Sequence, residues 1–140
     1  MSKASNSSTL KLKILDGTFA VVHLPLTTKV LPTCSDTAEL WSLTRSKIEY
    51  SLVLSENLAA PLTGPDAQVN GGWVAYYLQG PIPFNMTGII ARLTSPLGEI
   101  KVGCFVVSTF DSDFVLVKKA DQLAAQAAWQ QGGITILGSL

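Results

Sequence analysis

Two apolar runs flank a short polar segment in FVVSTFDSDFVLV, residues 105–117. Valine, leucine and phenylalanine dominate both runs, a composition typical of buried strands. The residues between them, STFDSD at 108–113, are mostly Ser, Thr and Asp, whose side chains hydrogen-bond nearby backbone and favour turns. This stretch therefore predicts two covered strands joined by a polar turn.

The neighbouring segments extend these two strands to a βαββαβ pattern. Residues 73–78 predict a preceding strand, and an amphipathic helix is expected to follow Asn85. Its apolar residues recur on one stripe, namely Met86, Ile89, Ile90, Leu93 and Leu97. A second helix is predicted over 120–131, ended by two glycines, and a last strand over 134–137. This order predicts a ferredoxin-like α+β unit, with two helices on one face of an antiparallel sheet.

The first half of the chain predicts further strands. Apolar residues alternate over 10–15, and a second apolar run at 19–24 follows the turn-forming pair Asp16-Gly17. Two such runs around Asp-Gly predict a hairpin. Additional strands are expected at 40–43 and 50–54, with a brief helical turn over Ser46–Glu49.

A faint internal repeat relates the two halves. Residues 43–45 followed by 50–54 resemble residues 108–110 followed by 114–117, since each copy runs through a Thr into an apolar strand. Between the halves, residues 55–72 are enriched in Ala, Pro, Gly, Asn and Gln, which is typical of a linker.

Composition narrows the classes of function. The chain has 140 residues, 47% of them apolar, which suffices for one core or two small ones. Lys plus Arg equals Asp plus Glu, and only 14% of residues are charged, so the basic surface of a nucleic-acid-binding protein is missing. No apolar run approaches the roughly 20 residues of a membrane span, and residues 1–8 have no signal-peptide character. Cys34 and Cys104 show no paired spacing. We expect a cytoplasmic protein without nucleic-acid or membrane partners.

Catalytic motifs are not found. His23 is the single histidine, and neither a Gly-x-Ser-x-Gly elbow nor a phosphate loop occurs. Asp111 and Asp113 alone do not predict a carboxylate pair that acts on one substrate. With Ser112 between them they provide too few ligands for a metal. The sequence therefore predicts no catalytic residues, no metal site, no cofactor and no enzymatic activity.

Several stretches resemble the ACT domain of small two-domain ACT proteins and of cytosolic amino-acid sensors of the CASTOR type. They are LQGPIPF (78–84), MTGIIA (86–91), SPL (95–97), FVVSTFDSDFVLVK (105–118) and, in the first half, GTFAV (17–21) and LWSLT (40–44). The resemblance implies two tandem ferredoxin-like ACT units: a degenerate one at 9–57, a linker at 58–71 and a C-terminal ACT domain at 72–138. One departure is Lys101, where the family pattern has a glycine suited to a left-handed helix end.

The same resemblance implies a function. ACT proteins are often dimeric and bind a small ligand, commonly an amino acid, where ACT units meet. We therefore expect a homodimeric regulatory or nutrient-sensing module that acts allosterically, in trans, on a partner protein. The implied ligand-binding residues are Phe84, Asn85, Met86, Thr87, Gly88, Ile89, Ser108, Thr109, Phe110, Asp111 and Asp113.

These residue types suit an amino acid. Its carboxylate would meet the free N–H groups of a helix N-terminus at residues 85–88, where Gly88 permits close approach. Its ammonium would meet Asp111 or Asp113, with Ser108 and Thr109 as further polar partners. Phe110 would cover the ligand's side chain.

Structural interpretations stand beside these. Residues 108–113 are also ordinary turn chemistry, Asn85 is a candidate N-cap, and Gly88 would also permit helix–sheet packing. The tryptophans, Trp41, Trp73 and Trp129, are expected to be packing residues, with an interface position as the alternative for Trp129. The alternative function is a ligand-free interaction or dimerisation domain with a vestigial site.

Overall fold

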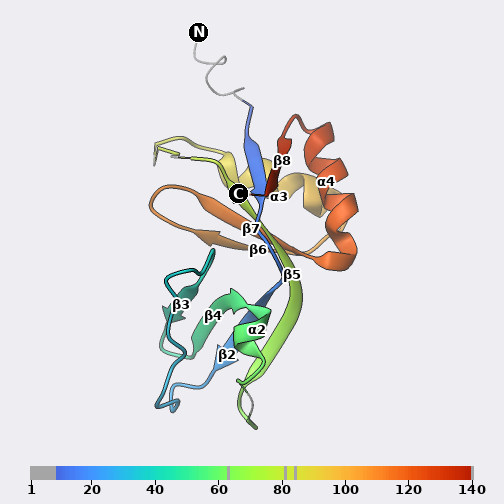
Figure 1. Cartoon of the computed structure of the whole chain (residues 1–140). Coiled ribbons are helices and arrows are strands. Elements are labelled where there is room, and N and C mark those ends of the chain that lie inside the picture. The colour runs from blue at the N-terminus through green and yellow to red at the C-terminus, as the bar shows by residue number, and fades with distance from the viewer. Residues whose placement is uncertain (1–8, 63, 81, 84, 140) are drawn as a thin grey trace. The chain divides into compact units, whose positions relative to one another are not determined.

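The chain forms two compact units in a computed structural model that describes residues 9–62, 64–80, 82–83 and 85–139 (Figure 1). The flanking unit comprises the chain up to Leu15 and from Val74 onward. The inserted unit comprises Asp16–Trp73. The long strand β5 (Gln68–Leu78) contributes its first residues to the inserted unit and its last residues to the flanking unit.

The flanking unit is a five-stranded sheet with two helices. Its other elements are β1 (Lys11–Ile14), α3 (Ile89–Glu99), β6 (Cys104–Ser108), β7 (Asp113–Lys118), a short 3-10 turn (Lys119–Asp121), α4 (Gln122–Gln131) and β8 (Thr135–Ser139). The strand order is β8-β1-β5-β7-β6, with β1 antiparallel to β5 and parallel to β8. Without β1, this is the βαββαβ order of a ferredoxin-like unit, as predicted.

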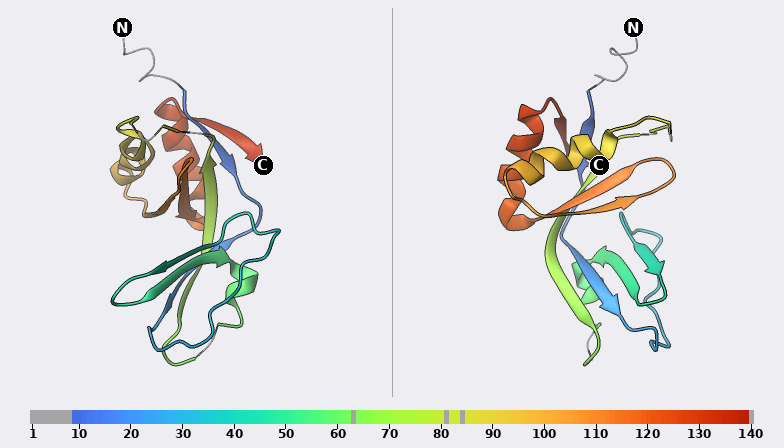
Figure 2. Two further views of the ribbon diagram at one scale, coloured as in Figure 1. Left: turned by 90° about the vertical axis from the view of Figure 1, so that its left-hand side faces the viewer. Right: turned by 180° about the vertical axis from the view of Figure 1, so that it is seen from behind.

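Both long helices of the flanking unit pack on the same face of its sheet (Figure 2). Between them lies Trp129 of α4, which is fully buried. Its indole N–H donates to the Leu93 carbonyl oxygen of α3 at 2.8 Å, and its ring meets Tyr76 edge to face at 4.9 Å. The prediction of Trp129 as a packing residue is confirmed, and its alternative as an interface residue is wrong.

The predicted hairpin between residues 10–15 and 19–24 is wrong. Leu12 of β1 pairs with Leu78 of β5 and with Ile136 of β8, not with the following strand. The alternation correctly predicted a strand, because Leu10 and Leu12 point into the core of the flanking unit. Local alternation specifies which face is buried, however, and not which strand is the neighbour.

The inserted unit has a four-stranded antiparallel sheet in the order β3-β4-β2-β5. Its elements are β2 (Phe19–Leu24), β3 (Ser42–Arg45), β4 (Tyr50–Ser55), the single-turn helix α2 (Glu56–Ala59) and the start of β5. This is a ferredoxin-like order in which residues 25–41 contain no helix. α2 packs on β2 and β4 over a small core formed by Ala20, Val22, Leu24, Leu52, Leu54 and Ala59.

Two local expectations in the inserted unit need correction. Residues 46–49 form the turn of the β3–β4 hairpin rather than a helical turn, with the Ser46 N–H bonded to the Glu49 carbonyl oxygen at 3.0 Å. The segment expected as a linker, residues 58–71, contains the end of α2 and the first residues of β5. The Gly and Asn residues of this segment do not prevent a strand, since Asn70 and its neighbours pair with β2.

The two long helices end in the same Schellman motif. After α3, Lys101 donates to the Gly98 carbonyl and Val102 to that of Leu97. After α4, Gly133 and Ile134 repeat this pattern. The motif needs a left-handed residue, which is Gly133 at φ 85° in α4 but Lys101 at φ 60° in α3. The lysine departure noted in the sequence therefore keeps the geometry for which the family pattern has a glycine.

Replacing Lys101 with glycine is expected to raise the free energy of unfolding by about 0.5–1 kcal/mol. The left-handed conformation costs an L-residue about 1–2 kcal/mol, and the added freedom of the unfolded chain returns about 0.4–1 kcal/mol of that. Urea denaturation would measure the change. The matched control is Gly133→Ala, which places a side chain at the equivalent position of α4 and should destabilise the protein. If both variants changed stability in the same direction, this explanation would fail.

Candidate functional site

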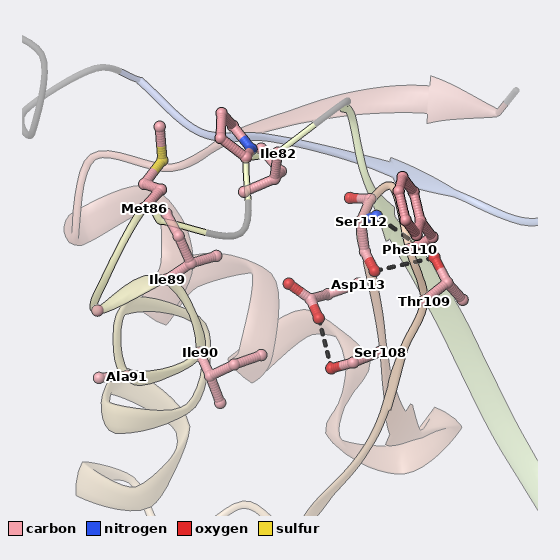
Figure 3. A pocket seen from close by; sticks show the side chains of 12 residues that line it. Ile82, Met86, Ile89, Ile90, Ala91, Ser108, Thr109, Phe110, Ser112 and Asp113 are labelled. Atoms are coloured by element: carbon pink, nitrogen blue, oxygen red, sulfur yellow. Dashed lines mark hydrogen bonds between the residues drawn. The ribbon is translucent and has the colours of Figure 1, made fainter.

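A cavity of about 450 Å³ opens in the flanking unit between the start of α3 and the turn that joins β6 to β7 (Figure 3). Its volume lies in the range of small-molecule sites. The residues that line it are Ile82, Pro83, Met86, Gly88, Ile89, Ile90, Ala91, Ser108, Thr109, Phe110, Ser112 and Asp113. The two segments that the sequence singled out thus lie on opposite sides of one space.

The helix side of the cavity is set by Gly88. α3 begins at Ile89, and Gly88 caps it at φ 77°, a left-handed conformation that glycine adopts without strain. The prediction of Asn85 as the N-cap is therefore wrong, because the helix begins three residues later. The N–H groups of Ile89, Ile90 and Ala91 have no partner inside the helix, and all three residues line the cavity.

Gly88 does not serve helix–sheet packing. A Cβ built at Gly88 would meet no atom within 4 Å, so that alternative is wrong. Open space lies beside the backbone at the first turn of α3. The partial positive charge of the helix N-terminus lies beside the cavity, which residues 88–91 line.

The opposite side is a turn held by its own hydrogen bonds. The Thr109 N–H donates to the Ser112 carbonyl oxygen at 2.8 Å, and the Thr109 hydroxyl donates to the same oxygen at 3.0 Å. The Ser112 N–H donates to Thr109 Oγ1 at 3.3 Å. Ser112 is buried, and its hydroxyl donates to the Leu78 carbonyl oxygen of β5. These bonds fix the turn to the sheet, as the turn-scaffolding interpretation expected.

Gly80 allows the segment after β5 to lie close to this turn. The Ile82 N–H donates to the Asp111 carbonyl oxygen at 2.7 Å, which ties the segment after β5 to the turn. A Cβ at Gly80 would lie only 2.8 Å from that same oxygen and 3.2 Å from the Ser112 Cβ. A side chain at residue 80 would therefore push the turn away from the sheet.

Substituting Gly80 with alanine is expected to cost about 1–3 kcal/mol of stability, the usual penalty of overpacking. Thermal denaturation would measure it. Gly98→Ala is the control, because Gly98 lies within α3 with nothing within 4 Å of a built Cβ. That control should gain about 0.5–1 kcal/mol from helix propensity. Equal stability of the two variants would contradict the proposed close approach at Gly80.

Asp113 is the charged side chain of the cavity lining. Its Oδ1 accepts the Ser108 hydroxyl at 2.5 Å. The carboxylate lies on the side of the turn that faces Ile89 and Ile90 (Figure 3). A carboxylate and a helix N-terminus, which attract opposite charges, thus face each other across the cavity.

The structure brings together seven of the residues predicted for the site, namely Met86, Gly88, Ile89, Ser108, Thr109, Phe110 and Asp113. Asn85, Thr87 and Asp111 are exposed and do not line the cavity. Phe84 lies outside the described residues. The Phe110 ring lies beside Thr109 and Ser112 with 77% of its surface exposed, so it does not cover the cavity (Figure 3).

Five lining residues were missed by the sequence reasoning: Ile82, Pro83, Ile90, Ala91 and Ser112. Ile90 and Ala91 follow from the later start of α3, for which the signal was Gly88 rather than Asn85. Ser112 carried no separate signal, since its role depends on the carbonyl of a distant strand.

The described part of the chain has neither a metal-binding group nor a membrane-spanning helix. No three His, Cys, Asp or Glu side chains gather there as a metal-binding group. Among the described helices, none is both long and apolar enough to cross a membrane.

Comparison with known proteins identifies the family. An ACT-domain family profile matches residues 68–130. Protein Atu0741 from Agobacterium tumefaciens is 32% identical, over 96% of this chain and 96% of that one, with a TM-score of 0.81. The chain belongs to the family of Atu0741 and carries an ACT domain. No protein with a curated description matches it.

More distant structures share the fold of this ACT-domain protein. A putative C-terminal regulatory domain of aspartate kinase from Porphyromonas gingivalis W83 is 17% identical, over 89% of this chain and 96% of that chain, with a TM-score of 0.56. The regulatory subunit of aspartate kinase from Thermus thermophilus is 8% identical, over 89% of this chain and 97% of that one, also at 0.56. The ACT match spans the cavity, which lies within residues 82–113.

Proposed function

We propose that this protein is a regulatory module whose ACT domain binds an amino acid in the cavity between α3 and the β6–β7 turn. One observation carries the proposal: a carboxylate and the free N–H groups of a helix N-terminus face one space of suitable size. An α-amino acid carries the two complementary charges on groups attached to the same carbon atom. Neither group alone would distinguish such a ligand from a simple ion.

In the bound state, the ligand carboxylate accepts N–H bonds from the first turn of α3, near Ile90 and Ala91. The ammonium donates to the Asp113 carboxylate, whose other hydrogen-bond donor is Ser108. Gly88 leaves the backbone open on this side. Phe84, Asn85, Thr87 and Asp111 have no assigned contact in this arrangement.

The regulatory role and action in trans rest on analogy. The Thermus thermophilus relative in fold is a regulatory subunit, and this chain covers nearly its whole length. A separate regulatory chain acts on a partner by binding it. A ligand would shift this binding equilibrium only if its affinity differed between the free and the partner-bound states. We include a homodimer in the proposal because Met86 and Ile90, beside the cavity, are partly exposed apolar residues.

Thermal denaturation in the presence of each of the twenty amino acids tests the proposal. A ligand at a hundredfold excess over its Kd should stabilise the native state by roughly 2.7 kcal/mol. Isothermal titration calorimetry of any amino acid that raises Tm gives its affinity. If no amino acid raises Tm at millimolar concentration, and calorimetry detects no binding to the folded protein, the proposal is wrong.

A ligand-free interaction domain is the second candidate, and the self-contained turn favours it. The hydroxyl groups of Thr109 and Ser112 already bond within the protein, so the turn needs no ligand to be ordered. This candidate predicts a dimer by light scattering that persists without any ligand and is unchanged in Asp113→Asn. Dimerisation that depends on an added amino acid would exclude it.

A further inference from the structure

We infer that the cavity selects aliphatic α-amino acids and rejects those with an acidic or amide side chain. This inference rests on the proposed function and adds the class of ligand. It follows from which hydrogen-bond donors in the cavity are already occupied.

Each hydroxyl donor among the described lining residues is used within the protein. Ser108 donates to Asp113, Thr109 to the Ser112 carbonyl, and Ser112 to the Leu78 carbonyl. A hydroxyl has a single proton to donate, so none of the three has one left for a ligand oxygen.

Several backbone donors of the lining are used as well. The N–H groups of Ile82 and Met86 donate to the carbonyl oxygens of Asp111 and Pro83. The N–H groups of Thr109 and Ser112 serve the turn. The first turn of α3 provides the donors that remain on the helix side, and the ligand's own carboxylate takes these.

The remaining lining is apolar or negative. Among the described residues of this lining there is no Lys, Arg or His, while Ile82, Pro83, Met86, Ile89 and Ile90 supply hydrocarbon surface. An aliphatic side chain gains from burial against this surface. A carboxylate or amide at the same position would lose water without gaining a donor, and a carboxylate would also be repelled by Asp113.

Leucine, asparagine and aspartate test this inference, since their side chains have the same branched shape and differ in polarity. A side-chain oxygen buried without a donor should weaken binding at least roughly tenfold. Calorimetry on the full chain is therefore expected to show leucine binding at least about tenfold more tightly than either of the other two.

A substituted cavity provides the complementary measurement. Ile90→Lys introduces a cation and donor at a lining position that is 41% exposed, so the helix tolerates it. We expect this variant to raise the affinity for aspartate and to lower that for leucine. Leu123→Lys is the matched control, because Leu123 lies on α4 with 82% of its surface exposed and outside the cavity lining. It should leave both affinities unchanged.

Each outcome bears on a different claim. Tighter binding of leucine, reversed in Ile90→Lys alone, supports the inference. Equal or tighter binding of asparagine or aspartate to the unsubstituted protein overturns the inference but leaves the proposed function intact. The same conclusion follows if other polar amino acids bind and leucine does not. Binding of no amino acid at all to the folded protein overturns the proposed function and this inference together.

Discussion

Replacing Trp129 with alanine is expected to lower the free energy of unfolding by about 3–5 kcal/mol, the cost of emptying a large buried site. The side chain is fully buried between the two helices of the flanking unit. Three interactions are lost together: apolar burial, the bond to the Leu93 carbonyl and the edge contact with Tyr76. Chemical denaturation followed by circular dichroism would measure the loss.

Two further variants separate these contributions. Trp129→Phe keeps an aromatic ring but removes the indole donor, so the lost hydrogen bond should account for about 1 kcal/mol beyond the smaller volume. Leu123→Ala, on the exposed face of the same helix, should change stability by no more than about 0.5 kcal/mol. A loss below about 1 kcal/mol for Trp129→Ala would show that the helices do not depend on this contact.

Asp113→Asn is expected to weaken amino-acid binding roughly 10- to 150-fold. The change replaces a carboxylate by a neutral amide of the same shape, which removes a charge-assisted bond to the ligand ammonium worth about 1.5–3 kcal/mol. The amide oxygen can still accept the Ser108 hydroxyl, so the turn is retained. Calorimetry with leucine would measure the loss.

The matched control is Asp111→Asn, two residues away. The Asp111 side chain is exposed and outside the cavity, and its backbone carbonyl, which holds Ile82, is unaffected by the substitution. This control carries the same change in net charge and should bind like the unsubstituted protein. Equal weakening in both variants would indicate a general electrostatic effect rather than contact with Asp113.

The ferredoxin-like part of the fold could be predicted from local patterns. The stripe from Ile89 to Leu97, the two apolar runs around residues 108–113 and the Gly132-Gly133 helix end each specify an element without reference to distant residues. The position of β1 could not be predicted this way. Its alternation is equally compatible with pairing to the next strand, and only the completed sheet shows that it lies between β5 and β8.

Part of the cavity lining could be predicted from the sequence for a related reason. Chemistry and resemblance singled out the segments 84–89 and 108–113, and some residues of each segment line one cavity. Its details depended on backbone conformation: the left-handed Gly88 moves the helix start away from Asn85. The hydrogen bond from Ser112 to Leu78 joins residues far apart in the sequence, and no local pattern encodes it.

The position of β1 has a consequence for how the protein is made. A ribosome synthesises β1 early, but its two neighbours arrive only with Leu78 and, much later, with Ile136. The inserted unit has all of its residues available well before then. It can therefore fold while synthesis continues. β1 can pair with β5 once Leu78 has been synthesised, but its other edge stays unpaired until β8 is available. During translation, Lys11 and Lys13 on this waiting strand would discourage pairing with other nascent chains.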